Sequence, residues 1–344
     1  MRLAEARAAW RRRRALLAGL LPSAALPGCD AAGLANALTP RGGHRRVVDL
    51  AFGPLPRQKL DLYLPAVAGP EAPPLLVFIH GGNWRMGSRK DYPFLAQALA
   101  SRGMAVAVPD YRLYPEARWP DFLEDNARAV AWLRGEQGRA AGAPQGPCFA
   151  MGHSAGAYNA AALALDPRWL DASGLPGGRN ALAGVIALAG PFDWVPRDEP
   201  LATIFAPAPG GRLDAAPSDA ALVGAPPALL LHGEADRTVG PFHSVRLAER
   251  LCAAGGAPEL RLYPGVGHIG IVAAFAAPLR ALGLARAPAL EDVAAFVGRV
   301  RARVGANETR PLRDRFAALR AEHPVPPSTG EKADKAFFDD LGGG

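Results

Sequence analysis

Apolar and polar positions form regular blocks along most of the chain, from about residue 47 to residue 304. Short continuous apolar runs, such as "LLVFI" at 75–79, are typical of strands that are buried on both faces. Between these runs lie longer segments in which apolar residues recur three and four positions apart, as on one side of a helix. Strands that alternate with helices at this spacing predict a parallel sheet with helices on both faces.

Individual elements follow from the same pattern. Two strands at 45–52 and 59–64 are joined by a turn with Gly and Pro, which predicts an antiparallel start to the sheet. The whole pattern predicts an α/β fold with a mostly parallel, doubly wound sheet. Its crossovers between parallel strands should be right-handed, as such connections nearly always are. We expect further strands at 75–79, 104–110, 147–151, 184–189, 228–232 and 259–263, and helices at 91–102, 120–137, 155–165, 241–254 and 289–303.

No shift in composition divides this region, so we expect a single domain at about 40–305. Within it, residues 191–226 interrupt the alternation of strands and helices with many prolines and glycines among scattered apolar residues. This segment predicts a small lid insertion rather than another helix–strand unit. Residues 306–344 are polar and contain several prolines and glycines, which predicts a short helix at 312–322 followed by a disordered tail.

The net charge of +7 raises the question of nucleic-acid binding. Much of this charge lies at one end, because residues 1–28 hold six arginines and one glutamate. The remaining chain carries 33 basic and 31 acidic residues and is therefore nearly neutral. We expect no basic binding face and no nucleic-acid partner.

The N-terminal segment resembles an export signal. The cluster "RRRR" precedes "ALLAGLLPSAAL", an apolar run that is too short to span a bilayer and has the length of a signal-peptide core. The following "LPGC" at 26–29 resembles a bacterial lipobox, with Pro27 where a small or aliphatic residue is usual. We predict a signal peptide at 1–28 and a periplasmic or membrane-anchored protein that is lipidated at Cys29. The alternative is an uncleaved basic helix in the cytoplasm.

The other two cysteines lie in different kinds of pattern. Cys148 falls in an apolar strand and Cys252 in a helical segment, which predicts two separate buried thiols rather than a disulfide. Cysteines and histidines do not have the spacing of metal ligands anywhere in the sequence, and the motif "HExxH" is absent. The sequence therefore shows no sign of a metal site.

The stretch "GHSAG" at 152–156 fits the pattern Gly-x-Ser-x-Gly. Its surroundings are those of a nucleophile at a sharp strand-to-helix turn, because "PCFAM" precedes it and the helical "AYNAAALAL" follows. Such a turn holds the serine hydroxyl exposed above the end of the sheet, and the flanking glycines avoid collisions with neighbouring backbone. The motif therefore predicts Ser154 as a nucleophile.

A serine hydroxyl needs a base and an acid that orients the base. Both should follow the serine at the ends of later strands, with the acid before the histidine. Asp236 follows the run "ALLLHG", and His268 lies 32 residues further on in the Gly-rich "GVGH". Asp193, after the strand at 184–189, is the competing acid. We interpret the histidines His80, His153 and His232 as residues that pack loops beside glycines.

The tetrahedral intermediate of acyl transfer carries an oxyanion, which needs N–H donors that are already in place. Ala155, directly after the predicted nucleophile, supplies one such donor. The others should come from "HGGNW" at 80–84, which directly follows the apolar strand "LLVFI". Gly81 and Gly82 let the backbone approach an anion closely, and the amides of Gly82 and Asn83 are the favoured donors.

Taken together, "HGGNW", "DYRLYPEARWPDFLED" at 110–125, "GHSAG", "HGEADRTV" at 232–239 and "GVGH" resemble the motifs of the α/β-hydrolase superfamily. They are most similar to its hormone-sensitive-lipase-like carboxylesterase and kynurenine-formamidase group. The resemblance extends from Val47 to about Val304, and Asn83 stands where that group often has a third glycine or a tyrosine. It implies a Ser–His–Asp hydrolase that works without metal or cofactor.

The predicted function is hydrolysis of small acyl or aryl esters through an acyl-enzyme. Ester and amide hydrolysis use the same three residues, so an arylformamidase or a small serine peptidase is an alternative. A non-catalytic lipoprotein that keeps the fold for binding is a third hypothesis, and an intact Ser–His–Asp set argues against it. The oligomeric state does not follow from the sequence. Five apolar residues are candidates to line the substrate pocket: Trp84, Phe192, Trp194, Phe205 and Ile269.

Overall fold

The computed structural model describes residues 28–303, except residues 41, 68, 70, 176, 209–210, 212 and 215–218. The predicted signal peptide, apart from Gly28, and the predicted helix and tail at 306–344 lie outside these residues, as does the side chain of Cys29. Export and lipidation therefore stay predictions. None of the helices in the described part of the chain is long and apolar enough to cross a membrane.

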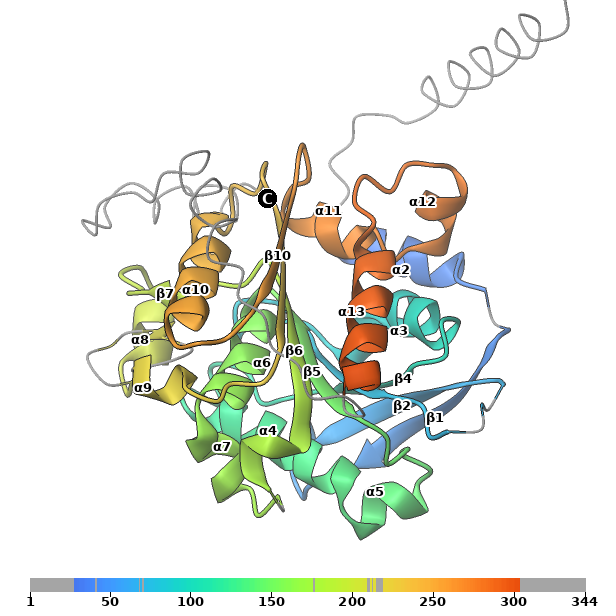
Figure 1. Cartoon of the computed structure of the whole chain (residues 1–344), viewed down its shortest axis with the longest axis horizontal. Helices are drawn as coiled ribbons and strands as arrows, with labels where there is room; N and C mark the ends of the chain where they lie inside the picture. The colour runs from blue at the N-terminus through green and yellow to red at the C-terminus, as the bar shows by residue number, and fades with distance from the viewer. Residues whose placement is uncertain are drawn as a thin grey trace, which may run out of the picture.

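Eight strands form one twisted sheet through the middle of the molecule (Figure 1). Their order across the sheet is β1-β2-β4-β3-β5-β6-β9-β10. β1 and β2 run antiparallel to each other, β2 runs antiparallel to β4, and all the other neighbours are parallel. The strands are β1 His44–Ala51, β2 Lys59–Pro65, β3 Leu75–Ile79, β4 Ala105–Pro109, β5 Cys148–His153, β6 Leu182–Leu188, β9 Ala228–Gly233 and β10 Glu259–Tyr263.

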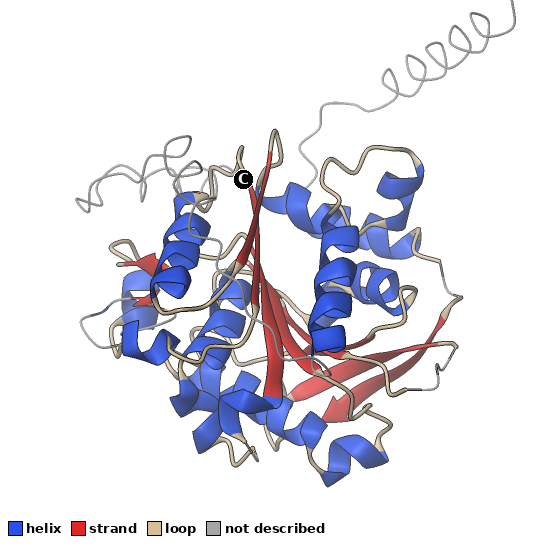
Figure 2. Ribbon diagram, viewed as in Figure 1, coloured by secondary structure: helices blue, strands red, loops and turns tan. Residues whose placement is uncertain are grey.

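Helices cover both faces of this sheet (Figure 2). The longer ones are α2 Gly28–Ala37, α3 Pro93–Ala100, α4 Asp121–Arg134, α6 Ala155–Leu165, α10 Phe242–Ala253 and α13 Ala289–Arg303. Shorter ones are α5 Glu136–Ala140, α7 Pro167–Ala172, α8 Leu201–Phe205, α9 Asp219–Leu222, α11 His268–Ala273, α12 Ala277–Ala281 and the 3-10 turns η1 Arg89–Asp91 and η2 Gly178–Ala181.

Successive side chains of the central strands enter two different cores. In β3, Leu75, Val77 and Ile79 pack in the core that holds α4, α6 and part of α10. Leu76 and Phe78 of the same strand point to the other face, where α3 and α13 lie. All five side chains are fully buried, which explains the continuous apolar run. The predicted fold class, a mostly parallel sheet with helices on both faces, is confirmed.

Most of the predicted elements are present, with small shifts at their ends. The predicted helix at 120–137 is wrong in one respect, because Gly135 has extended backbone, ends α4 and precedes the separate α5. Within residues 191–226, the structure has the two-residue strands β7 Asp193–Trp194 and β8 Leu213–Asp214 with α8 and α9. This agrees with an irregular insertion, whereas its role as a lid stays a prediction. Cys148 is buried, Cys252 is half-buried, and the two do not form a disulfide with each other.

Candidate functional site

Ser154 sits at the sharp turn between β5 and α6. Its backbone has φ 55° and ψ −124°, a conformation that a non-glycine residue adopts only when its surroundings impose it. A Cβ on Gly152 would lie 2.1 Å from the carbonyl oxygen of Gly156, and one on Gly156 would lie 2.0 Å from that of Ile79. The two glycines therefore allow the turn to form against β3, as the motif predicts.

The structure brings the predicted nucleophile, base and acid together. Nε2 of His268 lies 2.9 Å from Oγ of Ser154, and Nδ1 of His268 lies 2.7 Å from Oδ2 of Asp236. Ser154 comes from the end of β5, Asp236 follows β9, and His268 is the first residue of α11, after β10. The competing acid Asp193 instead lies 3.9 Å from Arg246, measured between Oδ2 and Nη1.

The carboxylate of Asp236 is completely buried and strongly hydrogen-bonded. Its Oδ1 accepts the backbone N–H groups of Thr238 and Val239, each at 2.9 Å. Burial alone would raise the pKa of Asp236, but the interactions with His232 and His268 outweigh burial and hold the pKa well below its usual range. The acid is therefore ionised across the neutral range and can stabilise a charged His268.

A second histidine lies behind the acid. Nε2 of His232 is 2.9 Å from the carbonyl oxygen of Val239 and 3.4 Å from Oδ2 of Asp236. Because a carbonyl can only accept, Nε2 carries the proton, and Nδ1 accepts from the hydroxyl of Ser244 at 2.7 Å. The interpretation of His232 as a residue that only packs a loop is therefore incomplete. Its position four residues before the predicted acid Asp236 is the feature of the sequence that could have indicated this contact.

The predicted oxyanion loop lies directly against the nucleophile. A Cβ on Gly81 would be 3.1 Å from Cβ of Ser154. Gly82 has φ +117°, and a Cβ there would lie 2.2 Å from the carbonyl oxygen of Met86, so this position requires glycine. Within the described part of the chain, the N–H groups of Gly82, Asn83 and Ala155 have no protein acceptor. These amides are therefore available to an anion.

His80 holds the peptide that joins the two glycines. Its Nδ1 donates to the carbonyl oxygen of Gly81 at 2.8 Å. The C=O and N–H groups of a trans peptide point in opposite directions, so this bond turns the N–H of Gly82 the other way. The ring is fully buried and stacks on Tyr111, with centroids 4.4 Å apart. Burial lowers the pKa of His80 to about 4, which keeps it neutral.

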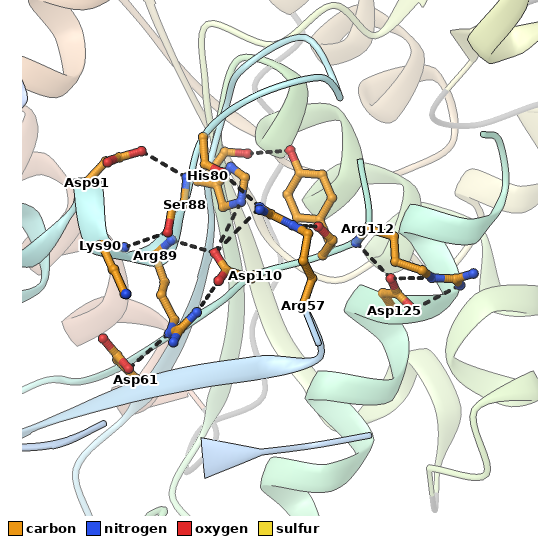
Figure 3. A network of polar contacts seen from close by, with 12 residues as sticks. Arg57, Asp61, His80, Ser88, Arg89, Lys90, Asp91, Asp110, Arg112 and Asp125 are labelled. Carbon is orange, nitrogen blue, oxygen red and sulfur yellow. Dashed lines mark hydrogen bonds and ion pairs between the residues drawn. The ribbon is translucent and has the colours of Figure 1, made fainter. Parts of the chain in front are cut away.

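A buried network of charges supports the base of this loop (Figure 3). Arg89 is only 6% exposed, and its guanidinium contacts Asp110, Asp61 and Asp49. Its backbone N–H also donates to Oδ1 of Asp110 at 2.6 Å. Arg57 joins the network through Asp110, with Nη2 3.8 Å from Oδ1, and also donates to the carbonyl oxygen of Gly87 at 2.8 Å. The loop is thus tied at its far end to β2 and β4.

The rest of the motif "DYRLYPEARWPDFLED" forms a second ion pair. Arg112 donates from Nε and Nη2 to the two carboxylate oxygens of Asp125, at 2.8 and 3.0 Å (Figure 3). Asp125 is 1% exposed and also accepts from Gln58. The motif therefore fastens α4 to the strand ends around the site, a role that its sequence did not indicate.

Replacement of Asp110 by alanine is expected to lower the free energy of unfolding by about 3 kcal/mol. The change leaves the buried guanidinium of Arg89 with fewer acceptors, although Asp61 and Asp49 remain. Urea denaturation gives the difference. The control is Glu291→Ala, which breaks an exposed pair with Arg102 and should cost less than about 1 kcal/mol. Equal effects of the two substitutions would contradict the role of burial.

The five predicted pocket residues differ in exposure. Trp84, Phe192 and Phe205 are at most 1% exposed, Trp194 is 9% exposed, and Ile269 is 62% exposed. Nε1 of Trp84 donates to Oδ1 of Asn159 at 2.9 Å, and its ring packs edge-on against that of Phe205. Trp84 therefore anchors the predicted oxyanion loop in the core. Contact of these five residues with substrate stays a prediction, which for the three fully buried ones requires movement of their neighbours.

Known proteins are similar in sequence to the part of the chain that holds this site. The BD-FAE family model matches residues 60–200, which include the predicted oxyanion loop and the turn at Ser154. Esterase LipC of Mycobacterium tuberculosis is 31% identical over 251 residues, covering 65% of this chain and 60% of LipC. Isoprenylcysteine alpha-carbonyl methylesterase ICME of Arabidopsis thaliana is 28% identical, covering 64% of this chain and 55% of ICME.

Solved structures agree on the fold. Esterase B from Lactobacillus rhamnosis superposes with a TM-score of 0.65 at 20% identity, covering 88% of this chain and 96% of that one. A truncated carbohydrate esterase from gut microbiota gives 0.62 at 19% identity, covering 77% of this chain and 99% of that one. The chain therefore has the α/β-hydrolase fold. The family resemblance of the motifs is confirmed.

Not every relative of this chain is named an esterase. Kynurenine formamidase of Danio rerio is 28% identical over 150 residues, covering 44% of this chain and 47% of the formamidase. These relatives fit the predicted carboxylesterase and kynurenine-formamidase group. The chain spans about half to three fifths of the length of LipC, ICME and the formamidase.

Proposed function

We propose that this α/β-hydrolase is a serine carboxylic-ester hydrolase in which Ser154 is the nucleophile, His268 the base and Asp236 the orienting acid. The observation that carries the proposal is the chain of two hydrogen bonds, 2.9 Å from Oγ to Nε2 and 2.7 Å from Nδ1 to Oδ2. A base within this distance can take the hydroxyl proton as the oxygen attacks. Its relatives LipC and ICME, which are named as esterases, support the ester as substrate.

In the first half-reaction, Oγ of Ser154 forms a bond to the carbonyl carbon of the ester while its proton moves to Nε2 of His268. The imidazolium that results is stabilised by the buried carboxylate of Asp236. Collapse of the tetrahedral intermediate breaks the bond to the alkoxy oxygen, which leaves with the proton from Nε2. The products of this step are an alcohol and the acyl ester of Ser154.

The negative oxygen of that intermediate would be bound by the amides of Gly82, Asn83 and Ala155. This assignment is supported by their N–H groups, which have no acceptor among the described residues, and by the contact of Gly81 with the serine turn. His80 and the Arg89 network hold the loop before substrate arrives, and donors that are already oriented need no rearrangement as charge develops. Loss of one such donor typically lowers turnover by about 10²-fold to 10³-fold.

The formamidase relatives support one second candidate, hydrolysis of an aryl formamide by the same residues. An amide has a poorer leaving group than an ester, so its nitrogen must receive the proton from His268 before it departs. The three side chains serve both reactions, and the choice between them depends on the residues that bind the leaving group.

The deciding experiment combines labelling with a substrate comparison. A fluorophosphonate probe should modify Ser154, identified by mass spectrometry of the labelled peptide, because it reacts with activated serines. Turnover is then measured on p-nitrophenyl esters of increasing acyl length and on N-formylkynurenine. We expect higher kcat/KM on the short esters. Faster cleavage of N-formylkynurenine would favour the formamidase, and the absence of labelling would contradict both candidates.

A further inference from the structure

His153 is a buried residue of the site that the proposed mechanism leaves without a task. It is the last residue of β5, directly before Ser154, and is 3% exposed. Its Nε2 lies 3.1 Å from the backbone carbonyl oxygen of His268, and the two imidazole rings are 4.8 Å apart. On its other side, a Cβ on Gly81 would be 3.3 Å from Nδ1. The ring therefore sits between the base and the oxyanion loop.

In the hydrogen bond between His153 and His268, the imidazole of His153 is the donor. A carbonyl oxygen can only accept, so Nε2 of His153 carries the proton and donates it. Burial and the neighbouring His268 lower the pKa of His153 to about 3. The side chain is consequently neutral at the pH at which serine hydrolases work, and it remains a donor of one hydrogen bond whatever the charge of His268.

This hydrogen bond joins two segments that are far apart in the sequence. His153 belongs to the same turn as Ser154, whereas His268 begins the six-residue helix α11. That helix has no side-chain cap, and Gly267 before it has extended backbone. The base is therefore connected to the serine turn in two ways, through Oγ of Ser154 and through the imidazole of His153. Only the second connection is independent of the state of the serine hydroxyl.

The difference matters once the serine is acylated. In the acyl-enzyme, Oγ of Ser154 is an ester oxygen without a hydrogen, so it no longer donates to Nε2 of His268. Water must then attack the acyl carbon while its proton moves to Nε2. Collapse breaks the bond between the acyl carbon and Oγ, which takes the proton back and releases the carboxylic acid. His268 must stay in place without help from the serine.

We propose that His153 is the positioning residue that holds His268 during deacylation, through its hydrogen bond to the backbone carbonyl of His268. This proposal rests on the proposed function. Asp236 orients the imidazole ring through Nδ1, while His153 fixes the backbone from which that ring extends. Loss of the donor should therefore slow the second half-reaction more than the first, in which Oγ of Ser154 still binds the base.

The experiment compares His153→Leu with His153→Gln in the full chain. Leucine removes the donor, whereas the amide nitrogen of glutamine reaches about as far as Nε2 of histidine. Rapid mixing with p-nitrophenyl acetate gives the acylation rate from the burst and the deacylation rate from the steady state. We expect His153→Leu to lower the deacylation rate by about 10-fold to 100-fold, with a much smaller change in acylation. His153→Gln should restore most of the loss.

Two further variants keep the test decisive. If His153→Leu does not fold, His153→Asn replaces it, because its shorter amide cannot reach the carbonyl of His268. His243→Leu removes another buried imidazole, on α10, and should leave the ratio of the two rates unchanged. Equal slowing of both half-reactions, or none, would overturn the proposal. If instead the unmodified protein hydrolyses no ester, the proposed function itself fails.

Discussion

Replacement of Ser154 by alanine is expected to abolish ester hydrolysis without unfolding the protein. The substitution removes the oxygen that is proposed to form the acyl bond, so kcat on p-nitrophenyl acetate should fall by about 10⁴-fold to 10⁶-fold. The remaining rate would reflect the oxyanion donors of Gly82, Asn83 and Ala155, which the change leaves in place. Circular dichroism and urea denaturation should show a folded protein.

Ser154→Ala is also expected to be about as stable as the unmodified protein. Ser154 has a positive φ that alanine must also adopt, so the turn stays strained and stability should change little. Ser173→Ala is the matched control, because its hydroxyl donates only to the carbonyl oxygen of Leu170, away from the site. It should retain full activity. Hydrolysis or fluorophosphonate labelling that persists in Ser154→Ala would refute the assignment of the nucleophile.

The second large effect is expected for Asp236→Asn. Oδ1 of Asp236 accepts two backbone N–H groups, from Thr238 and Val239, so the amide oxygen of asparagine must occupy that position. The amide NH₂ group then faces Nδ1 of His268 and forces it to accept. The proton of the imidazole then sits on Nε2, so Nε2 can no longer accept the proton of Ser154.

Asp236→Asn should therefore lower kcat by about 10⁴-fold at neutral pH, as measured by steady-state hydrolysis of p-nitrophenyl acetate. Asp193→Asn tests the competing acid, which lies near Arg246 rather than His268. It should retain most of the activity. A strong loss in Asp193→Asn, together with an active Asp236→Asn, would reverse the assignment of the acid.

The local pattern was sufficient to predict the fold because the residues of each buried strand are apolar wherever the strand contacts a core. A strand such as β3 needs apolar side chains toward both cores, and this requirement is written into five consecutive residues. The serine turn is equally local. Gly152 and Gly156 are required by contacts of less than 3 Å with backbone, which makes the motif readable without any distant partner.

The supporting residues were less readable, because their roles depend on partners far along the chain. His153 and Trp84 have no periodic signal, and each contacts an atom supplied by a distant segment. Trp84 follows two glycines and an asparagine and was predicted to line the substrate pocket, yet its indole is buried against α6 and α8. The charge network around Arg89 likewise joins residues from β1, β2 and the end of β4.

The order of strands and helices, the serine turn and the candidate acid and base all followed from the amino-acid sequence, since each depends on neighbouring residues or on order along the chain. Only the tertiary structure decided which carboxylate meets His268, which side chains hold the oxyanion loop, and that a neutral imidazole links the serine turn to α11. These are contacts between segments that the sheet brings to one edge. Their distances arise from packing, which no local pattern records.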